Sequence, residues 1–483
     1  MLDGQRFGID IFEPNLPVVW YLCMPAALGV EWLGMTEVNA IRLWIWFLAG
    51  MSLLVAWACL NHSADRSYRL LAELSAAAVA ACILVGPSFG QREHLAFLLS
   101  LSYLFVVRLR SSGVAVESRL AIFAGVLGGL AFSIKPVFLV VPLAVEFSML
   151  ALWRRHWRLL RPETVTIAIA GCVSFLGTMA LAPDYLKTVV PAAYATYWAY
   201  DKPLGWVLAN YPVAVAVLAG WVAVVLADYR IARSSLTWFA AFGAWSVSYF
   251  FQHRGFDYHG YPATACAFVI SMGMLAILAG QAIGAADRSL AKEKIRLAKL
   301  KAAGVVALLL ITSQSLATDT RLWFRSTQED WPLSRYAARK ALLTYLQSQG
   351  IGVDTSVFTF SSNPSPAYPI LNYLGADGAG QDVAQFLLPA WLRRDEVRDP
   401  GRREAIEAAM VIQRQRVSQA LIMEEPDIIL VNKWSSSASP AGNRIKRADY
   451  FAIFGEDPAV AAALGRYRKT AELEGIEVYR RNE

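Results

Sequence analysis

Two carboxylates, Asp10 and Glu13, stand three residues apart just ahead of the first apolar stretch of the chain. A carboxylate in such a loop can act as a general base on an acceptor hydroxyl, or it can hold a divalent cation. The same spacing also fits a solvated loop in which the acids cap the helix that follows. Both interpretations stay open on spacing alone.

A second polar cluster consists of Gln91, Arg92, Glu93 and His94, at the edge of another apolar run. Four consecutive hydrogen-bonding side chains beside a membrane span are costly unless they face a cavity. Glu93 and His94 are candidate ligands for a divalent cation such as Mg²⁺, Mn²⁺ or Zn²⁺. Together with Arg92 they could instead grip a phosphate-bearing substrate. A plain interfacial helix cap would explain the same residues.

Two further features complete the set of candidates. The loop from Gln252 to Pro262 contains Arg254 and His259, which suit a phosphate anion, and Tyr258, whose ring suits the face of a sugar. An aromatic-belt loop is the alternative. Lys135 lies in a short turn between two apolar runs, where it could pair with an anionic lipid head group or simply extend to the interface.

The composition indicates an integral membrane protein. Of 483 residues, 56% are hydrophobic and only 17% are charged, whereas soluble domains have about 25% charged residues. The net charge of +7 comes from basic residues in short loops between apolar runs, which makes nucleic acid an unlikely partner. The five cysteines show no CxxC spacing, so neither a disulfide framework nor a zinc site is expected. This cysteine usage is compatible with a bacterial inner membrane.

The apolar runs predict about ten spanning helices. The loops richest in Lys and Arg all fall on one side, which should be the cytoplasm; they are 61–68, 109–118, 153–158, 228–234 and 287–304. Lys135-Pro136 should break one pair of short helices, because proline disfavours helical geometry at the residue before it. The expected spans are 41–60, 69–86, 93–108, 119–134, 137–152, 163–182, 206–227, 235–251, 261–282 and 302–317.

The N-terminal 40 residues are then expected outside, although no span precedes them. Residues 17–30 are too short for a span and should form an interfacial helix. Either a short tail crosses the membrane unaided, or the natural protein begins upstream with one more helix, which we favour.

Residues 318–483 change character and alternate strand-like with helical patterns, as in a small α/β domain. Strands are expected at 357–361, 427–432 and 475–480, and helices near 335–349, 380–394, 402–423 and 457–468. This part has no histidine and no nucleotide-binding motif, so it reads as a substrate-holding or structural cap. The expected divisions are an outer loop with an interfacial helix at 1–40, a transmembrane domain at 41–317 and an extracytoplasmic domain at 318–483.

In these motifs the sequence resembles the GT-C superfamily of membrane glycosyltransferases, which take a sugar from a polyprenyl-phosphate donor. Protein O-mannosyltransferases and aminoarabinose transferases are examples. The stretch from Gly4 to Pro17 is similar to the first outer loop of that family, and Asp10 matches its catalytic base. Residues 90–94 are similar to its second outer loop, residues 128–136 to a helix that ends in a lysine, and Tyr258-His259 to a pair before a proline-led helix. The chain departs from the family in lacking the first helix and in having Leu16 where a second proline is common.

The resemblance implies a helical GT-C-like membrane domain followed by a small α/β domain. It also implies an inverting displacement on the outer face of a bacterial inner membrane. Asp10 would deprotonate the acceptor, which is a glycan, a lipid or a protein. Arg92, Lys135 and Arg254 would neutralise the donor phosphate, while Glu93 and His94 would hold the donor or a cation. Glu13, Gln91, Tyr258 and His259 would complete the substrate site.

Two other functions fit the same spans. One is a flippase or transporter of a lipid-linked saccharide, and the other is a polysaccharide polymerase or ligase of a different fold. Transporters often have broken helices and polar groups at mid-membrane. Here the spans appear nearly free of charge, with the polar residues at one face, a pattern that favours surface chemistry.

Overall fold

The structure, a computed structural model, describes residues 5–61, 68–152, 157–209, 235–286, 337–433 and 448–482. The chain divides into two compact units. The first unit contains Met1–Pro17, Gly177–Pro203 and Ser326–Glu483, and the second contains Val18–Leu176 and Leu204–Arg325. The division therefore differs from the one expected: the N-terminal loop and the segment after residue 176 belong with the C-terminal domain.

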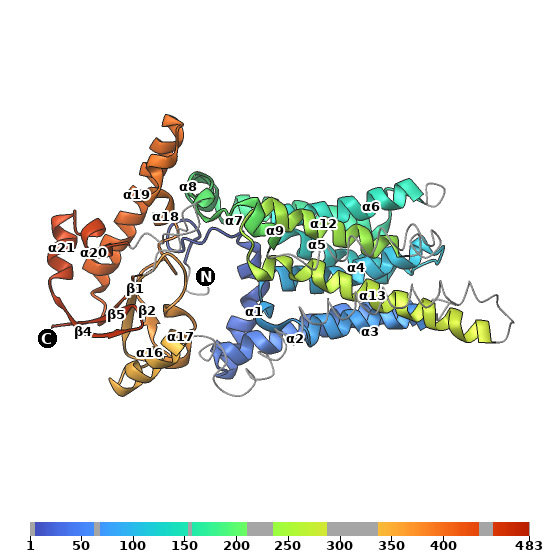
Figure 1. The fold of residues 1–483 in the computed structure, drawn as a ribbon, viewed down its shortest axis with the longest axis horizontal. Coiled ribbons are helices and arrows are strands. Elements are labelled where there is room, and N and C mark those ends of the chain that lie inside the picture. The colour runs from blue at the N-terminus through green and yellow to red at the C-terminus, as the bar shows by residue number, and fades with distance from the viewer. Residues whose placement is uncertain are drawn as a thin grey trace. The chain divides into compact units, whose positions relative to one another are not determined.

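The second unit is helical (Figure 1). Four of its described helices are long and apolar enough to cross a membrane: α2 (Glu37–Asn61), α4 (Arg92–Ser111), α7 (Pro162–Leu181) and the part of α13 from Asp257 to Ile277. The last residues of α7 lie in the first unit. The remaining helices of the second unit are α1 (Val18–Leu33), α3 (Tyr68–Cys82), η1 (Gly86–Ser88), α5 (Ser118–Ser133), η2 (Pro136–Leu139), α6 (Val140–Leu152), α9 (Leu204–Ala209) and α12 (Leu236–Gln252), while α13 runs on to Ala286.

These helices match eight of the expected spans in position, although several are shorter than a full crossing. Of the expected span 206–227, the structure describes only residues up to 209, and 302–317 lies outside the described residues. A helix, α1, is present where the sequence predicted an interfacial helix at 17–30, and Pro25 lies inside it. The break before Pro136 is confirmed, because α5 ends at Ser133 and Lys135 has extended backbone angles.

Helix α4 forms the centre of the second unit. Of its most apolar stretch of 18 residues, 94% is buried, and the helix contacts α2, α5, α12 and α13. Helix α7 is the opposite case, because only 6% of its most apolar stretch of 18 residues is buried. It packs on α5 through a stretch of small residues, where a Cβ on Gly129 would come within 2.4 Å of the Cβ of Ala170. Close approach of backbones at glycines is typical of helix pairs in membranes.

The soluble domain of the first unit is built on a five-stranded sheet of order β2-β1-β3-β5-β4. The three strands β2 (Asp377–Gly378), β1 (Ser356–Phe360) and β3 (Ile428–Asn432) are parallel, and β5 (Ile476–Arg481) and β4 (Tyr467–Leu473) continue the sheet in antiparallel pairing. The expected α/β character and the three expected strands are confirmed. Strand β4 was missed because its side chains are mostly exposed and charged or polar.

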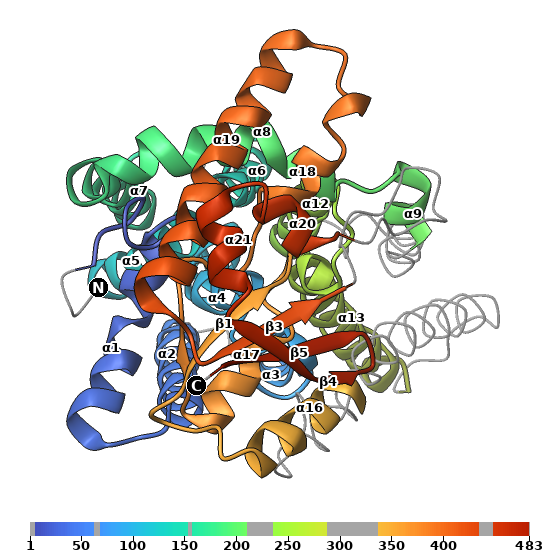
Figure 2. The same ribbon diagram turned by 90° about the vertical axis from the view of Figure 1, so that its left-hand side faces the viewer.

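Helices cover both faces of this sheet (Figure 2). Side chains alternate along β1, so Phe358 and Phe360 pack with α19–α21 and Val357 packs with α16 and α17. The expected helix at 380–394 is reduced to α18, and the helix expected at 457–468 ends at Leu464. The helices are α16 (Ala337–Ser348), α17 (Ala367–Leu374), α18 (Leu388–Leu392), η5 (Arg394–Glu396), α19 (Pro400–Gln419), η6 (Ala420–Glu424), α20 (Tyr450–Phe454) and α21 (Pro458–Leu464).

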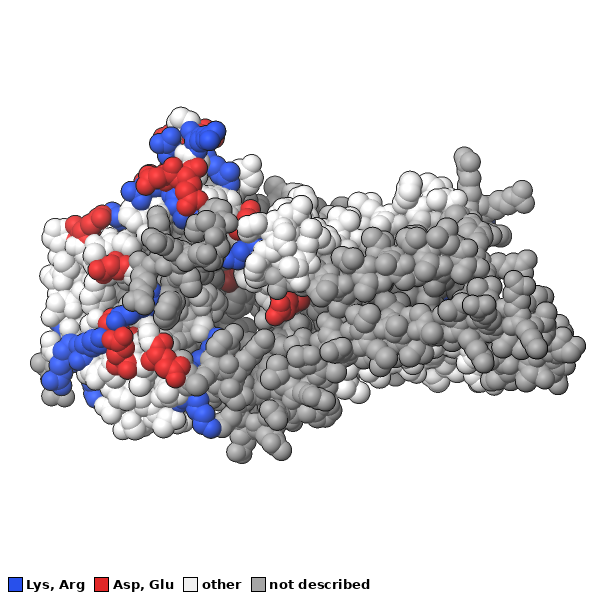
Figure 3. Space-filling model, in the orientation of Figure 1, with Lys and Arg blue, Asp and Glu red and all other residues white. Residues whose placement is uncertain are grey.

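The first unit also contains the segment that follows α7, which consists of η3 (Tyr185–Val189), α8 (Val190–Thr196) and η4 (Tyr197–Tyr200). Tyr200 donates its hydroxyl to the carbonyls of Ser362 and Phe386 at the carboxyl end of β1. Acidic and basic side chains are conspicuous over the soluble domain in Figure 3, whereas the described surface of the helices is largely uncharged in that view.

Candidate active site

Glu93 is the centre of a polar cluster in the second unit. It lies in the first turn of α4 and is fully buried. The Lys135 ammonium is 2.5 Å from the Glu93 Oε1 atom, and the His259 Nε2 atom is 3.5 Å from the same oxygen. Lys135 also donates to the Gln252 Oε1 atom at 3.0 Å. Glu93, Lys135, Gln252 and His259, from three separate parts of the sequence, are thus brought together.

Local backbone geometry explains why these side chains converge. Lys135 projects from the turn between α5 and η2, and Gln252 is the last residue of α12. The chain then reverses through His253 and Gly255, both with positive φ. A Cβ on Gly255 would come within 2.4 Å of the Trp206 ring, so only glycine fits there. The reversal places His259 in the first turn of α13.

Aromatic rings fix the orientation of His259. The ring of Tyr258 is 4.5 Å from that of His259 in an edge-on arrangement, and Phe256 is 5.4 Å away, also edge-on. Phe256 and Tyr258 stack on each other. Arg92 lies within hydrogen-bonding reach of the Tyr258 hydroxyl. The predicted pair Tyr258-His259 therefore does lie beside Glu93 and Arg92.

The cluster contains more positive than negative charge. Arg92 and Arg254 lie close enough to Lys135 to interact with it electrostatically, and so does the Glu93 carboxylate. Lys135 belongs to the turn outside both flanking helices. Burial, together with the nearby charges of Arg92 and Arg254, lowers the pKa of its ammonium from 10.5 to about 8, against the attraction of Glu93. An anion bound here would offset the excess of positive charge.

Among the buried polar atoms of the cluster that lack partners within the described parts of the chain are the Glu93 Oε2 atom and the His259 Nδ1 atom. A buried polar group without a hydrogen bond is costly, and such groups in native proteins call for an explanation. A bound ligand with hydroxyl groups would satisfy both atoms.

His94 does not fit the role of metal ligand that the sequence suggested. Its Nδ1 atom accepts from the Gly90 backbone N–H at 3.1 Å, and its Nε2 atom is 2.9 Å from the Ala81 carbonyl oxygen. Both ring nitrogens are therefore in use, Nδ1 by the backbone just before α4 and Nε2 by the end of α3. No group of three or more His, Cys, Asp or Glu side chains in the described residues is arranged to hold a metal ion. Gln91 is exposed at the N-cap of α4 and makes no side-chain cap bond.

Asp10 and Glu13 belong to the first unit. The Asp10 carboxylate accepts the Arg6 backbone N–H at 2.8 Å, while the Asp10 N–H donates to the Arg6 carbonyl, so residues 6–11 form a closed turn. Glu13 is buried rather than solvated, and its carboxylate accepts from the backbone and side chain of Asn15. We call residues 6–13 the Asp10 loop.

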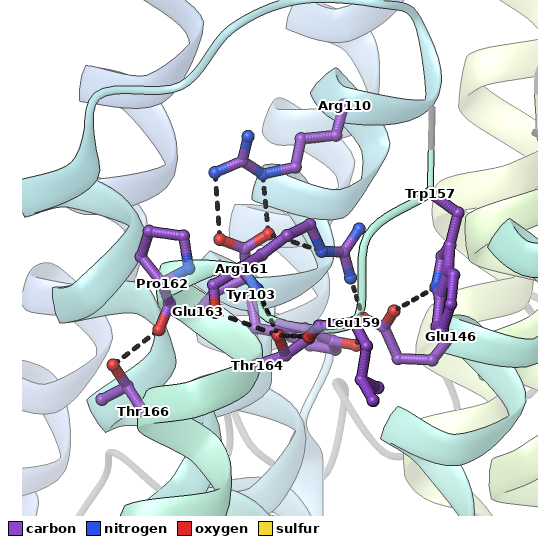
Figure 4. A network of polar contacts seen from close by, with 10 residues as sticks. All are labelled: Tyr103, Arg110, Glu146, Trp157, Leu159, Arg161, Pro162, Glu163, Thr164 and Thr166. Carbon is purple, nitrogen blue, oxygen red and sulfur yellow. Dashed lines mark hydrogen bonds and ion pairs between the residues drawn. The ribbon is translucent and has the colours of Figure 1, made fainter. Parts of the chain in front are cut away.

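Sequence reasoning missed a group of buried ion pairs at the other end of α4. Arg110 pairs with Glu163 at 2.6 Å, Arg161 bridges Glu163 to Glu146, and Tyr103 donates to Glu146 at 2.9 Å (Figure 4). A neighbouring set joins Glu73 to Arg69, Arg108 and Trp238.

The sequence predicted spans that are nearly free of charge, but the helical unit contains these buried charged side chains. Arg108 and Arg110 lie in the last turn of α4, roughly 25 Å along the helix from Glu93 at a rise of about 1.5 Å per residue. The basic side chains at the ends of apolar runs were visible in the sequence, but their acidic partners come from other helices.

Gln252 was also left out of the predicted site, although it opens a loop that was singled out. A polar residue at the end of an apolar helix is a candidate for such a site, and this position of Gln252 could have been recognised in the sequence.

Comparison with known proteins gives no family for the chain. No protein-family model matches it, and no curated protein matches it.

Proposed function

We propose that the protein is a membrane glycosyltransferase that moves a sugar from a polyprenyl-phosphate donor to a glycan, lipid or protein acceptor. The enzyme would act at the extracytoplasmic face of a bacterial inner membrane, with a GT-C-like arrangement of about ten spans. The observation that carries the proposal is the Glu93 cluster. It combines an excess of basic groups with buried unpartnered oxygen and nitrogen atoms.

The basic residues suit the leaving group. The guanidinium group of arginine, which can bind two oxygens at once, and the ammonium group of lysine are the usual partners of phosphate oxygens. Arg92, Lys135 and Arg254 would stabilise the negative charge that grows on the phosphate as the bond to the anomeric carbon breaks. Glu93 and His259, with one free polar atom each, would accept from and donate to sugar hydroxyls.

The Asp10 carboxylate would take the proton of the acceptor hydroxyl. The acceptor oxygen forms a bond to the anomeric carbon, the bond from that carbon to the phosphate oxygen breaks, and polyprenyl phosphate leaves. Attack opposite the leaving group inverts the anomeric centre in one step.

The decisive experiment is transfer by purified protein in detergent with radiolabelled polyprenyl-phosphate sugars. Label appearing on an acceptor, with loss of transfer in Glu93→Gln, is the expected result. Arg119→Met, an exposed change at the start of α5, is the matched control and should transfer normally. No transfer from any donor in a broad screen would overturn the proposal.

The buried ion pairs at the far end of α4 favour a second candidate, a transporter or flippase of a lipid-linked saccharide. Ionisable groups inside a helical membrane domain often mark a transport path. Reconstituted vesicles separate the two functions. Movement of intact labelled donor across the bilayer without transfer supports the transporter.

A further inference from the structure

The soluble domain contacts the Asp10 loop through Arg416, which also forms a buried ion pair within that domain. Arg416 on α19 pairs with Asp382 at 2.6 Å, and both side chains are less than a tenth exposed. Gln413, one turn earlier on α19, donates to the other Asp382 oxygen at 2.6 Å. The carboxylate thereby orients the guanidinium from one side.

The opposite side of the same guanidinium faces the Asp10 loop. Its Nη1 atom donates to the Ile9 carbonyl oxygen at 2.9 Å, directly before Asp10 in the chain. Its carbon atom lies 5.1 Å from the centre of the Phe12 ring. The Phe12 N–H in turn approaches the Gln381 carbonyl, next to Asp382, at 3.5 Å. Arg416 therefore contacts the residue before Asp10 and the ring two residues after it.

Apolar packing and one more hydrogen bond complete the seat of the loop. Phe7 and Phe12 are buried with Tyr185, Leu387 and Ala409. The Tyr185 hydroxyl donates to the Pro14 carbonyl at 3.0 Å. Apolar burial sets the general position of the loop, but it is not directional. The directional contact nearest to Asp10 from the soluble domain is the one made by Arg416.

We propose that Arg416, oriented by Asp382, is a positioning residue that fixes the Asp10 carboxylate for proton abstraction. The inference rests on the proposed function. Its physical basis is that a displacement of about 1 Å at a reacting group can cost on the order of a hundredfold in rate. Domain and loop would thus act together, so that the soluble domain is part of the catalytic machinery rather than a passive cap.

The test uses the full-length protein with two paired changes, Arg416→Met and Asp382→Asn. Removing Arg416 alone leaves a buried carboxylate unpaired and could unfold the domain. The double variant removes both charges, keeps Gln413 a partner, and deletes the donor to Ile9. The control is Arg414→Met. Arg414 lies on α19, as Arg416 does, and the change removes its surface ion pair with Glu456.

Two readouts are needed. Hydrogen exchange of the amides in 6–12 should speed up in the double variant, while those of β1 stay protected. For transfer, kcat should fall roughly tenfold to a hundredfold with KM for the labelled donor unchanged within about twofold, because chemistry and not donor binding is affected. Added to Asp10→Asn, the double variant should cause no further loss.

Unchanged exchange in the loop would overturn the proposal whatever the activity. A loosened loop with normal kcat would also overturn it, since the contact would then be structural only. If the wild-type protein transfers no sugar, the proposed function fails and the positioning role with it. The exchange data would then still show whether Arg416 holds the loop, so the two failures are distinguishable.

Discussion

The ammonium of Lys135 lies 2.5 Å from the carboxylate of Glu93, although 42 residues separate them in the chain. Lys135 reaches Glu93 from a turn between two short helices, and Glu93 stands in the first turn of the central helix. This pair joins two motifs that are far apart in the sequence. It makes the positive cluster a single site.

Asp10→Asn tests the proposed general base. Transfer should fall by about 10²- to 10⁴-fold, the usual contribution of such a group. Expression and membrane insertion should be unchanged, because the Asn side-chain oxygen can still accept the Arg6 N–H. Initial rates with labelled donor measure the effect, and Asp354→Asn, an exposed change in the same unit, is the control. Transfer at wild-type rates in Asp10→Asn would remove this assignment.

Lys135→Met tests the pair with Glu93. A buried carboxylate left without its partner destabilises a protein by about 3–5 kcal/mol, so the melting temperature in detergent should drop. Adding Glu93→Gln should restore most of the stability but not donor binding. Arg119→Met should change neither property. If the double variant binds and transfers normally, the cluster is a structural feature only.

The pH dependence of donor use should have an alkaline limb set by Lys135. Burial holds its pKa at about 8, so the ammonium is charged below that pH and loses its charge as the pH rises through it. Attraction for the donor phosphate then weakens, and kcat/KM should fall. Lys135→Arg keeps the charge at alkaline pH and should move the limb upward. An identical limb in this variant would assign it to another group.

Gly8→Ala tests the seat of the Asp10 loop. Gly8 has φ of +89°, and a Cβ there would lie 2.4 Å from the backbone carbonyl carbon of Asp184. Gly113 has φ of +80° with open space around it, so Gly113→Ala is a matched control. Both changes incur the left-handed backbone cost of about 1 kcal/mol. Only Gly8→Ala should displace the loop and reduce transfer, and equal activities would contradict the proposed seat.

Gly129→Leu tests the contact between α5 and α7. Its Cβ would strike Ala170, and overpacking of this kind costs about 1–3 kcal/mol or more. Thermal unfolding in detergent should shift downward. Gly171→Leu, on α7 with no heavy atom within 4 Å of its Cβ, should leave the unfolding temperature nearly unchanged. Equal shifts in the two variants would mean that α7 does not pack closely on α5.

Much of the architecture could be predicted because it depends on local pattern. Apolar length specifies a membrane helix, and Pro136 dictates the extended backbone at Lys135. The short, mostly apolar run within Ser356–Phe360 is typical of a strand that is covered on both faces. Strand β4 escaped because an exposed edge strand carries no apolar alternation, and its charged residues read as a solvated helix end.

The site was predictable in its membership but not in its contacts. Glu93, Lys135 and His259 were predicted as site residues because they lie at ends of apolar runs that were expected on the same face of the membrane. The same reasoning made His94 a cation ligand, but its ring nitrogens contact the backbone of Gly90 and Ala81. The partners of a polar side chain depend on which helices pack together, and the sequence specifies this only through tertiary structure.

The sequence by itself therefore determined which segments are apolar enough to leave water and where chain breaks must occur, because both are properties of short stretches. Tertiary structure alone decided that Glu93 meets Lys135, that Glu73 and Glu163 meet arginines, and that Arg416 reaches the Asp10 loop. Each of these contacts joins residues far apart in sequence, and buried charges select partners by distance in space.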